Sequence, residues 1–399
     1  MKASQRSGHG FSCVVCVVSL RGSLNNQTEE VVSPLPPISN RHGGNRHERA
    51  AALGCRPSDL LDLSASLVPF GPPPWLPRAL RRAVAEDLCG YPDRSYSSLR
   101  SQIAGQHQVD PAWVMPGNGA AELFTWIARQ ASHLNNVLPQ PGFADYGRAL
   151  ACWDAAIAPW QLKLNWAASS PLDFASAGTT LLPTGPGLAL WITNPHNPTG
   201  QLWSQESLKK LLPQFGLVVA DEAFLPLVPG GEDQSLIPLL ADHPNLVVVR
   251  SLTKMFAVAG LRLGYALAHP RWIEQWQQWR DPWPVNALAA AVAGSLLADQ
   301  RWQQRVQRWV DEEGHWLAGE LSQLQGIQPM PSAANYLLIR SEHELETLRQ
   351  RIESKHFILL RTALSFDGLD DHWLRIGLSD RRGHRRLLAA CSQELSEAR

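Results

Sequence analysis

Four reactive side chains lie close to the ends of apolar segments in the middle of this chain. Lys254 ends the segment SLTK, which follows the apolar run 246–249, and Arg262 comes shortly afterwards in GLRLGY. Upstream, Asn197 belongs to the turn NPHNPTG, and Asp221 ends the apolar run in VVADEAF. An amine, a guanidinium, an amide and a carboxylate can together hold a planar ligand that carries an aldehyde and a phosphate.

This set of groups is what pyridoxal phosphate requires. Lys254 is expected to form the Schiff base with the cofactor aldehyde. Asp221 would keep the pyridine nitrogen protonated, Asn197 would donate to the ring oxygen, and Arg262 would pair with the phosphate. Taken singly, each has a simpler interpretation: a solvated lysine, a capping aspartate or a rigid turn. The order of the whole set along the chain favours the cofactor site.

The segment GNGAAE, between a predicted strand and a predicted helix, is a candidate phosphate site. Gly119 and Ala120 could bring backbone N–H groups to the anion, although a structural glycine turn has the same pattern. Ser251 and Thr253 could add hydroxyl groups to the same phosphate. Phe143, in PGFADY, could stack on the pyridine face or pack in the core.

These residues need a scaffold that brings the ends of separate strands together. From about residue 95 apolar strands alternate with helical patterns, which is typical of a mostly parallel sheet with helices on both faces. Such sheets gather chemistry at the carboxyl ends of their strands. We therefore predict an α/β protein with a large cofactor-binding domain at 76–285, a small α+β domain at 286–399, and a segment at 41–75 that packs on the small domain and the active site.

Periodicity predicts the individual elements. The tryptophans Trp272, Trp276, Trp279 and Trp283 recur at helical spacing, which predicts a packed helical stripe. One predicted strand ends at Pro116, and the others cover 188–192, 217–220, 246–249, 335–339, 358–360 and 373–378. The predicted helices cover 122–132, 204–212, 287–320, 343–355 and 380–396.

Composition limits the classes of function. The 399 residues are 44% apolar and carry no formal net charge, so neither nucleic-acid binding nor a membrane-surface role has electrostatic support. Six scattered cysteines indicate a reduced, cytoplasmic protein, and no second pair accompanies Cys13 and Cys16 to make a metal site. Residues 1–40 are interpreted as a disordered extension or an early start codon in preference to a targeting signal.

The ordered motifs resemble the fold-type I, aspartate-aminotransferase-like enzymes that use pyridoxal phosphate. The resemblance covers residues 41 to about 395. It implies a transferase-like large domain and a homodimer whose active sites are shared between subunits. It also implies that Tyr91, in GYP, reaches the cofactor phosphate of the other subunit. A transcription regulator with such a domain is not favoured, because residues 1–40 are too few and not basic enough to bind DNA.

Within this superfamily, HGGN and DLSASLVPFGP resemble the opening of threonine-phosphate decarboxylases of cobalamin synthesis. His42 and Gly43 could form an anion site from an imidazole and backbone N–H groups, or a flexible turn. Ser66 and Val68 stand where that family usually has asparagine, which puts a direct polar contact from these positions in doubt. Phe224 stands where the related histidinol-phosphate aminotransferases usually have tyrosine, and it cannot donate a hydrogen bond.

Two late arginines complete the resemblance. Arg375 matches the residue that clamps the substrate α-carboxylate, with Asn197 beside it, and Arg361 matches a ligand of a substrate phosphate. Surface salt bridges are the alternative for both arginines. The resemblance implies decarboxylation of a phosphorylated amino acid, O-phospho-L-threonine, to (R)-1-amino-2-propanol O-2-phosphate. A histidinol-phosphate-type aminotransferase stays open, because it shares every cofactor residue and the sequence does not show how the substrate is turned.

Overall fold

The computed structural model describes residues 42–168 and 170–397, all of which fall within one compact unit. The predicted extension, residues 1–40, and its Cys13 and Cys16 lie outside the described residues. Among the described helices, none is both long and apolar enough to cross a membrane.

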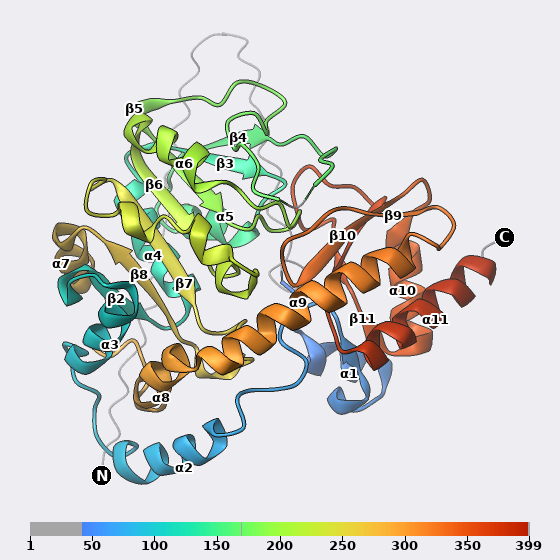
Figure 1. Ribbon diagram of the computed structural model, residues 1–399, viewed down its shortest axis with the longest axis horizontal. Coiled ribbons are helices and arrows are strands. Elements are labelled where there is room, and N and C mark those ends of the chain that lie inside the picture. The colour runs from blue at the N-terminus through green and yellow to red at the C-terminus, as the bar shows by residue number, and fades with distance from the viewer. Residues whose placement is uncertain (1–41, 169, 398–399) are drawn as a thin grey trace, which may run out of the picture. The chain divides into compact units, whose positions relative to one another are not determined.

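A sheet of seven strands positions the site (Figure 1). Across the sheet the strands are β2 (Val114–Gly117), β8 (Gly264–Ala268), β7 (Leu246–Ser251), β6 (Phe215–Asp221), β5 (Gly185–Thr193), β3 (Asn135–Gln140) and β4 (Ile157–Gln161). Strand β8 runs antiparallel to both of its neighbours, and the remaining pairs are parallel.

The central strands are apolar throughout because both faces of the sheet are covered. In β6, Val218 and Ala220 join one hydrophobic cluster, whereas Leu217 and Val219 join another on the opposite face. This alternation follows the two-residue period of a strand. Around the sheet lie the helices α2 (Leu76–Asp87), α3 (Ser97–His107), α4 (Ala120–Ala131), α5 (Ala144–Ala151), α6 (Gln205–Leu211), α7 (Pro270–Trp279) and α8 (Ala287–Ala298).

A smaller antiparallel sheet follows in the C-terminal part of the chain. Its strands are β12 (Arg361–Thr362), β13 (Trp373–Gly377), β10 (Tyr336–Ser341) and β9 (Ile327–Pro329), in that order. The helix α9 (Gln300–Leu321) contacts β9 and β10, and α10 (Leu345–His356) packs against α11 (Arg381–Glu397). Short 3-10 helices cover Pro57–Asp59, Pro111–Trp113, Leu212–Gln214, Leu225–Leu227, Gly231–Gln234, Ile237–Leu239 and Ala259–Leu261.

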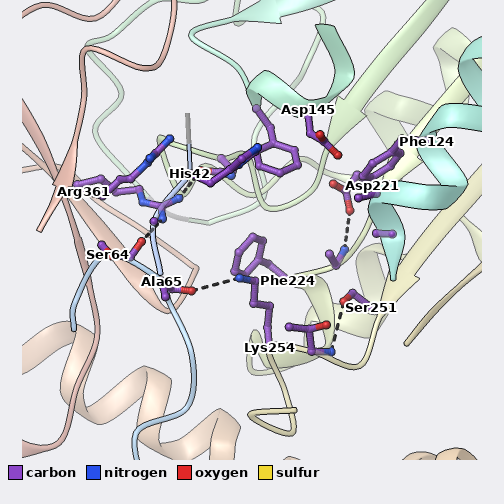
Figure 2. Close-up of a pocket in the computed structure, with 18 of the residues that line it drawn as sticks. His42, Ser64, Ala65, Phe124, Asp145, Asp221, Phe224, Ser251, Lys254 and Arg361 are labelled. Carbon is purple, nitrogen blue, oxygen red and sulfur yellow. Dashed lines mark hydrogen bonds between the residues drawn. The ribbon is translucent and has the colours of Figure 1, made fainter. Parts of the chain in front are cut away.

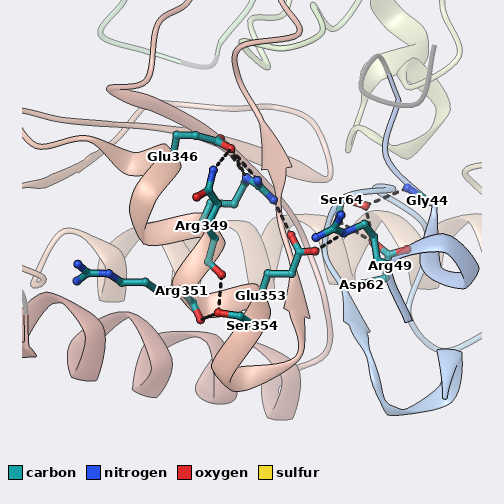
Figure 3. Close-up of polar contacts among 10 residues, drawn as sticks. Gly44, Arg49, Asp62, Ser64, Glu346, Arg349, Arg351, Glu353 and Ser354 are labelled. Atoms are coloured by element: carbon teal, nitrogen blue, oxygen red, sulfur yellow. Dashed lines mark hydrogen bonds and ion pairs between the residues drawn. The ribbon is translucent and has the colours of Figure 1, made fainter. Parts of the chain in front are cut away.

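The first described residues are attached to the C-terminal part of the chain (Figure 3). Strand β1 (Leu61–Asp62) pairs in parallel with β11 (Ile358–Leu359). On α1 (Arg46–Leu53), Arg49 forms an ion pair with Glu353 of α10, and Arg349 contacts the other oxygen of the same carboxylate at 2.6 Å. Residues 42–62 therefore pack against the C-terminal part of the chain, close to the cavity described below.

The predicted fold class is confirmed, because a mostly parallel sheet with helices is followed by a small antiparallel sheet. The predicted helix 287–320 is two helices, α8 and α9, which meet at Asp299. The tryptophan stripe is shorter than predicted, because α7 ends at Trp279 and Trp283 lies in the following loop. The predicted domain boundaries at 75 and 285 stay predictions.

Candidate active site

A cavity lies at the carboxyl ends of β5, β6 and β7 (Figure 2). The strand register pairs Thr193 with Asp221 and Asp221 with Val249, so these three strand ends lie side by side. The chain segments that follow them deliver the predicted reactive groups to one place. The sequence-predicted residues that line the cavity are His42, Gly43, Ala120, Phe143, Asn197, Asp221, Ser251, Thr253, Lys254, Arg262, Arg361 and Arg375.

Lys254 enters the cavity from the turn after β7. Its Nζ donates a hydrogen bond to the carbonyl oxygen of Ala65 at 3.1 Å and lies 5.7 Å from the ring centre of Phe224. Burial lowers the pKa of Lys254 to about 8, and the nearby Arg375 and Arg262 cations act in the same direction. A substantial fraction of the amine is therefore neutral, and hence nucleophilic, close to neutral pH.

Asp221 ends β6 and is held from two sides. Its Oδ2 accepts from the Tyr146 hydroxyl at 2.6 Å, and its Oδ1 accepts from the backbone N–H of Ala223 at 3.0 Å. Burial raises the pKa of Asp221 to about 6, although both hydrogen bonds act in the opposite direction. A buried carboxylate of this kind is stabilised by a cationic ligand group such as a protonated pyridine nitrogen.

Another group of residues in the cavity suits a phosphate. Helix α4 begins at Ala120, after Gly119 at a φ of 76°, so the first turn of this helix faces the cavity. A Cβ atom at Gly119 would lie 2.6 Å from Nη2 of Arg262, and the positive φ at this position is one that side-chain-bearing residues rarely adopt, so glycine suits the close approach. Ser251 and Thr253 line the same cavity and can add hydroxyl donors.

Arg375 and Asn197 form a pair on the substrate side. Nη1 of Arg375 donates to Oδ1 of Asn197 at 2.6 Å, which leaves the amide N–H groups of Asn197 as its donors. Nη2 of Arg375 donates to the carbonyl oxygen of Ser64 at 3.1 Å. The buried Nε of Arg375 has no hydrogen-bond partner among the described residues. Burial lowers the pKa of this guanidinium to about 10.

Arg361 lies beside Arg375, because β12 pairs with β13 in a register that places these two residues opposite each other. Burial lowers the pKa of Arg361 to about 9, and the Arg375 cation contributes in the same direction. His42 lies near Arg361 in Figure 2 and makes an edge contact with Phe143, with 5.7 Å between ring centres. Burial also lowers the pKa of His42, against the attraction of the Asp145 carboxylate.

The residues present fit pyridoxal phosphate. A partly neutral lysine, a buried carboxylate, an amide donor, an aromatic ring and a helix start next to an arginine surround one cavity. Beyond these groups the cavity holds Arg361, Arg375 and His42, which exceed what the cofactor needs and suit an anionic substrate. Within the described residues, no group of three or more histidine, cysteine, aspartate or glutamate side chains could hold a metal ion.

Two predicted residues lie outside the lining of the cavity. Gly119 stands behind it, next to Arg262. Tyr91 is 81% exposed and stacks on Trp283 with 4.4 Å between ring centres, and Arg94 lies over the same indole. The predicted contact of Tyr91 with the cofactor of a second subunit stays a prediction.

Sequence reasoning missed several groups that shape the site. The Ala65 carbonyl and the Ser64 carbonyl are backbone acceptors, and no residue type reveals such a role. Tyr146 and Asp145 begin helix α5 in the segment PGFADY, from which only Phe143 was singled out. The available signal was that an acid and a tyrosine follow the candidate stacking residue Phe143 within three positions.

The comparisons with known proteins agree with this geometry. The family model described as aminotransferase class I and II matches residues 58–390. Threonine-phosphate decarboxylase from Salmonella typhimurium is 35% identical over 370 residues, which cover 90% of this chain and 98% of that protein. Histidinol-phosphate aminotransferase from Methanothermobacter thermautotrophicus is 27% identical over 385 residues, covering 93% of this chain and 96% of that protein.

A solved structure shows the same fold. Histidinol-phosphate aminotransferase from Sinorhizobium meliloti, in complex with pyridoxal 5′-phosphate, aligns with a TM-score of 0.76. The alignment covers 93% of this chain and 100% of that chain, at 21% sequence identity. At this identity the likeness is one of fold, and it does not separate decarboxylation from transamination.

Proposed function

Because this chain belongs to the aminotransferase class I and II family and uses pyridoxal phosphate, we propose that it decarboxylates O-phospho-L-threonine. The product is (R)-1-amino-2-propanol O-2-phosphate, a building block of cobalamin biosynthesis. The reaction makes the protein a carbon–carbon lyase. The name of the Salmonella relative, threonine-phosphate decarboxylase, supports this proposal, and so does the charge of the cavity.

The observation that carries the proposal is a pair of buried guanidinium groups on the substrate side of the cavity. Arg361 is 5% exposed and Arg375 is 6% exposed, and they face each other across two paired strands. Burial lowers the pKa of both guanidinium groups, and a bound anion would favour the charged form of each. O-phospho-L-threonine carries two anionic groups, a carboxylate for Arg375 and a phosphate for Arg361. Histidinol phosphate carries a phosphate but no carboxylate, whereas the 2-oxoglutarate that an aminotransferase also uses does carry carboxylates, so the choice between the two reactions needs the assay with O-phospho-L-threonine.

The residues of the chain divide the work at the cofactor. Bound pyridoxal phosphate supplies an electron sink for the bond that breaks at the substrate Cα. Asp221 would hold a proton at the ring nitrogen, and Asn197 would donate to the ring oxygen. Phe143 would cover one face of the ring, while Arg262, Ser251 and Thr253 would hold the phosphate, together with the start of α4.

Substrate orientation decides which bond breaks. Arg375 holds the carboxylate end of the substrate, and Arg361 and His42 hold the phosphate end, so these three residues together set the position of the substrate carboxylate relative to the ring. Bound pyridoxal phosphate would supply the electron sink for the Cα bond that these residues hold in the reactive orientation. After CO₂ has left, the amine of Lys254 returns a proton to Cα.

Phe224 supports the decarboxylase over the aminotransferase. The Phe224 ring packs at the edge of Tyr336, with 5.2 Å between ring centres, and has no hydroxyl to offer the ring oxygen of the cofactor. Asn197 is then the side-chain donor that we assign to that oxygen.

One assay separates the two reactions. The holoenzyme is incubated with O-phospho-L-threonine in the absence of any keto acid, and CO₂ and the amino alcohol phosphate are measured. Release of CO₂ over many turnovers supports the proposal. A requirement for 2-oxoglutarate, with glutamate formed and no CO₂ released, contradicts it and identifies a histidinol-phosphate-type aminotransferase, whose activity is then tested with histidinol phosphate.

We further propose a homodimer with shared active sites. The exposed Tyr91 ring suits this arrangement, because it stands away from the cavity of its own chain. Its hydroxyl would donate to the cofactor phosphate of the partner subunit. Mixing Tyr91→Phe subunits with Lys254→Ala subunits tests the sharing. In a mixed dimer, the site that keeps Lys254 should receive the intact Tyr91 of the partner subunit and regain activity, whereas sites built from one subunit would regain none. A cytoplasmic location, inferred from the cysteine usage, is part of the same proposal.

A further inference from the structure

Ser64 lies between two groups that face the substrate. Its carbonyl oxygen accepts from Nη2 of Arg375 at 3.1 Å, and its hydroxyl oxygen accepts from the backbone N–H of Gly44 at 2.9 Å. Gly44 belongs to the loop that carries His42 into the cavity. One residue, 4% exposed, therefore contacts both the predicted carboxylate clamp and the loop of the predicted phosphate ligand.

The hydroxyl of Ser64 is oriented by an acid. It donates to Oδ1 of Asp62 at 2.6 Å, and the same oxygen accepts from the Ser64 backbone N–H at 2.9 Å (Figure 3). With its single hydrogen directed to Asp62, the hydroxyl presents a lone pair to Gly44. The acceptor role of Ser64 toward the loop is thus fixed by its neighbour.

Residue 64 is itself anchored firmly. The adjacent Leu63 N–H donates to the carbonyl oxygen of Leu359 at 2.9 Å, and the Leu63 carbonyl accepts from Gly377 at 2.7 Å. Gly377 ends β13, the strand that carries Arg375. Movement of this strand would therefore carry residue 64 with it.

The loop lies so close to Ser64 that a side chain would not fit between them. A Cβ atom on Gly43 would lie 2.1 Å from the Ser64 carbonyl oxygen and 2.9 Å from its hydroxyl oxygen. Such a contact with backbone cannot be relieved by a side-chain rotation. The position of residue 43 is therefore set by residue 64.

We propose that Ser64 is a positioning residue that holds His42 at a fixed place relative to Arg375, and so selects substrates by the spacing of their two anionic groups. This inference rests on the proposed function, because it takes His42 as a ligand of the substrate phosphate. Ser64 lines the cavity, but its role is assigned through the loop, and none of the groups assigned to the cofactor belongs to it. Its effect should appear chiefly in the binding of phosphorylated ligands, because Ser64→Ala keeps the carbonyl oxygen that holds Arg375 and changes no group assigned to the cofactor.

The test uses the holoenzyme and the variant Ser64→Ala. Loss of the hydroxyl leaves the Gly44 N–H without its acceptor, and KM for O-phospho-L-threonine should rise about five- to twenty-fold, the order expected for one hydrogen bond. The kcat value should stay within about twofold, since no group at the cofactor changes. Ser64→Thr keeps the hydroxyl and should restore KM to within about threefold of the unaltered enzyme.

A matched control lies two residues further along. The hydroxyl of Ser66 is buried and has no hydrogen-bond partner among the described residues, so Ser66→Ala removes the same atom without removing a hydrogen bond. It should leave KM unchanged. The inhibition constant of L-threonine, which lacks the phosphate, should be equal in Ser64→Ala and in the unaltered enzyme.

Combining variants shows whether Ser64 acts through His42. In a His42→Ala background, Ser64→Ala should raise KM by less than about twofold, because the positioned group is already gone. The inference is overturned if Ser64→Ala leaves KM unchanged, if kcat falls and KM does not rise, or if the two effects multiply in full. Loss of stability alone is recognised by a lower Tm with unchanged KM, and this also contradicts the inference.

The proposed function can fail independently of this inference. If the unaltered enzyme releases no CO₂ from O-phospho-L-threonine, the decarboxylase proposal fails before any variant is compared. The same series is then measured by binding, with O-phospho-L-threonine and inorganic phosphate as probes and the absorbance of the bound cofactor as signal. Weaker binding of both probes in Ser64→Ala, but not in Ser66→Ala, supports the positioning role. Equal binding in all three proteins overturns it.

Discussion

The Tyr146 hydroxyl donates a hydrogen bond of 2.6 Å to the carboxylate of Asp221, which lines the cavity. The oxygen of Tyr146 lies 2.8 Å from the Thr193 hydroxyl, which can donate to it because the tyrosine hydrogen is already used. Strands β5 and β6 place Thr193 opposite Asp221. A short chain of hydrogen bonds thus supports the acid that we assign to the cofactor nitrogen.

Tyr146→Phe should weaken the binding of pyridoxal phosphate. The hydrogen bond favours the charged carboxylate, so its loss raises the pKa of Asp221 further above the present value of about 6. The dissociation constant should rise about five- to thirty-fold at pH 7, or about 1–2 kcal/mol. The loss should be smaller at pH 8, where Asp221 is ionised in both proteins. Spectroscopic titration of cofactor-free protein measures both values.

Tyr265→Phe is the control for this prediction. Tyr265 is also buried, and its hydroxyl lies 2.7 Å from Nε2 of His107, away from the cavity. Its removal should cost stability while leaving the cofactor affinity unchanged. Equal weakening in both variants, or a loss that does not depend on pH, would contradict the role assigned to Tyr146.

Lys254→Ala should abolish the covalent link to the cofactor and the activity, and it should leave the fold intact. The side chain occupies the cavity, and within the described part of the chain its Nζ donates a hydrogen bond to the Ala65 carbonyl alone, so its loss disturbs little packing. Borohydride treatment followed by peptide mass spectrometry should find a pyridoxyl group on Lys254 in the unaltered protein and none in the variant. Circular dichroism checks the fold. A variant with normal turnover would falsify the assignment.

The rate at which cofactor-free protein takes up pyridoxal phosphate should depend on pH through Lys254. Only the neutral amine reacts with the aldehyde, and burial lowers the pKa of Lys254 to about 8. The rate should therefore rise about tenfold from pH 7 to pH 9 and then level off, as a group of this pKa loses its proton. Stopped-flow absorbance follows the reaction.

Arg375→Gln refines this pH prediction. The Arg375 cation also lowers the pKa of Lys254, so its removal should move the midpoint of the rate profile to higher pH. A profile that rises steadily beyond pH 10 in the unaltered protein would show that Lys254 behaves as an exposed lysine. That outcome would contradict the buried environment described above.

Arg361 and Arg375 should affect different parts of the substrate. Arg361→Gln should raise KM for O-phospho-L-threonine about tenfold or more, through loss of a charge-assisted contact to the phosphate, and leave the inhibition constant of L-threonine within about twofold. Arg375→Gln should weaken the binding of both ligands, because both carry the α-carboxylate. Equal effects of the two changes on both ligands would contradict the assignment of one anion to each arginine.

The strands and the reactive residues could be predicted from the sequence because both follow from side-chain type. A parallel strand that is buried on both faces is a continuous apolar run, and Asp221 and Lys254 stand where such runs end. The prediction made the tryptophan stripe too long, because the helical spacing of the tryptophans continues after the helix itself has ended. Trp283 follows Pro282, and the residue before a proline disfavours helix.

Other parts of the site had no signal in residue type. The contacts of Ala65 and Ser64 use backbone oxygens, which every residue carries. The pairing of Arg361 with Arg375 depends on the register of two antiparallel strands, and one sequence does not show that register. Contacts between distant chain segments therefore required the structure, whereas the chemistry of the individual groups did not.

Arg250 lies on β7, the strand that precedes Lys254, and its replacement should lower the stability of the protein strongly. It is 2% exposed, and its guanidinium contacts the fully buried Glu222 at 2.7 Å and the half-exposed Glu232 at 2.7 Å. Arg250→Leu would leave the Glu222 carboxylate buried without its counter-ion, at a cost of about 3–5 kcal/mol in the free energy of unfolding at pH 7. Urea denaturation measures this loss.

The sign of the pH dependence tests the cause of that loss. Burial already raises the pKa of Glu222, and Arg250 opposes the rise, so the variant should have a still higher value in the folded state. A folded-state pKa above the unfolded value means that stability is lost as the pH rises through it. Arg250→Leu should therefore be less destabilised at pH 5 than at pH 7. Arg56→Leu, which breaks an exposed pair with Asp59, should change stability little at either pH. An equal loss at both values for Arg250→Leu would show that packing, and not the buried charge, is responsible.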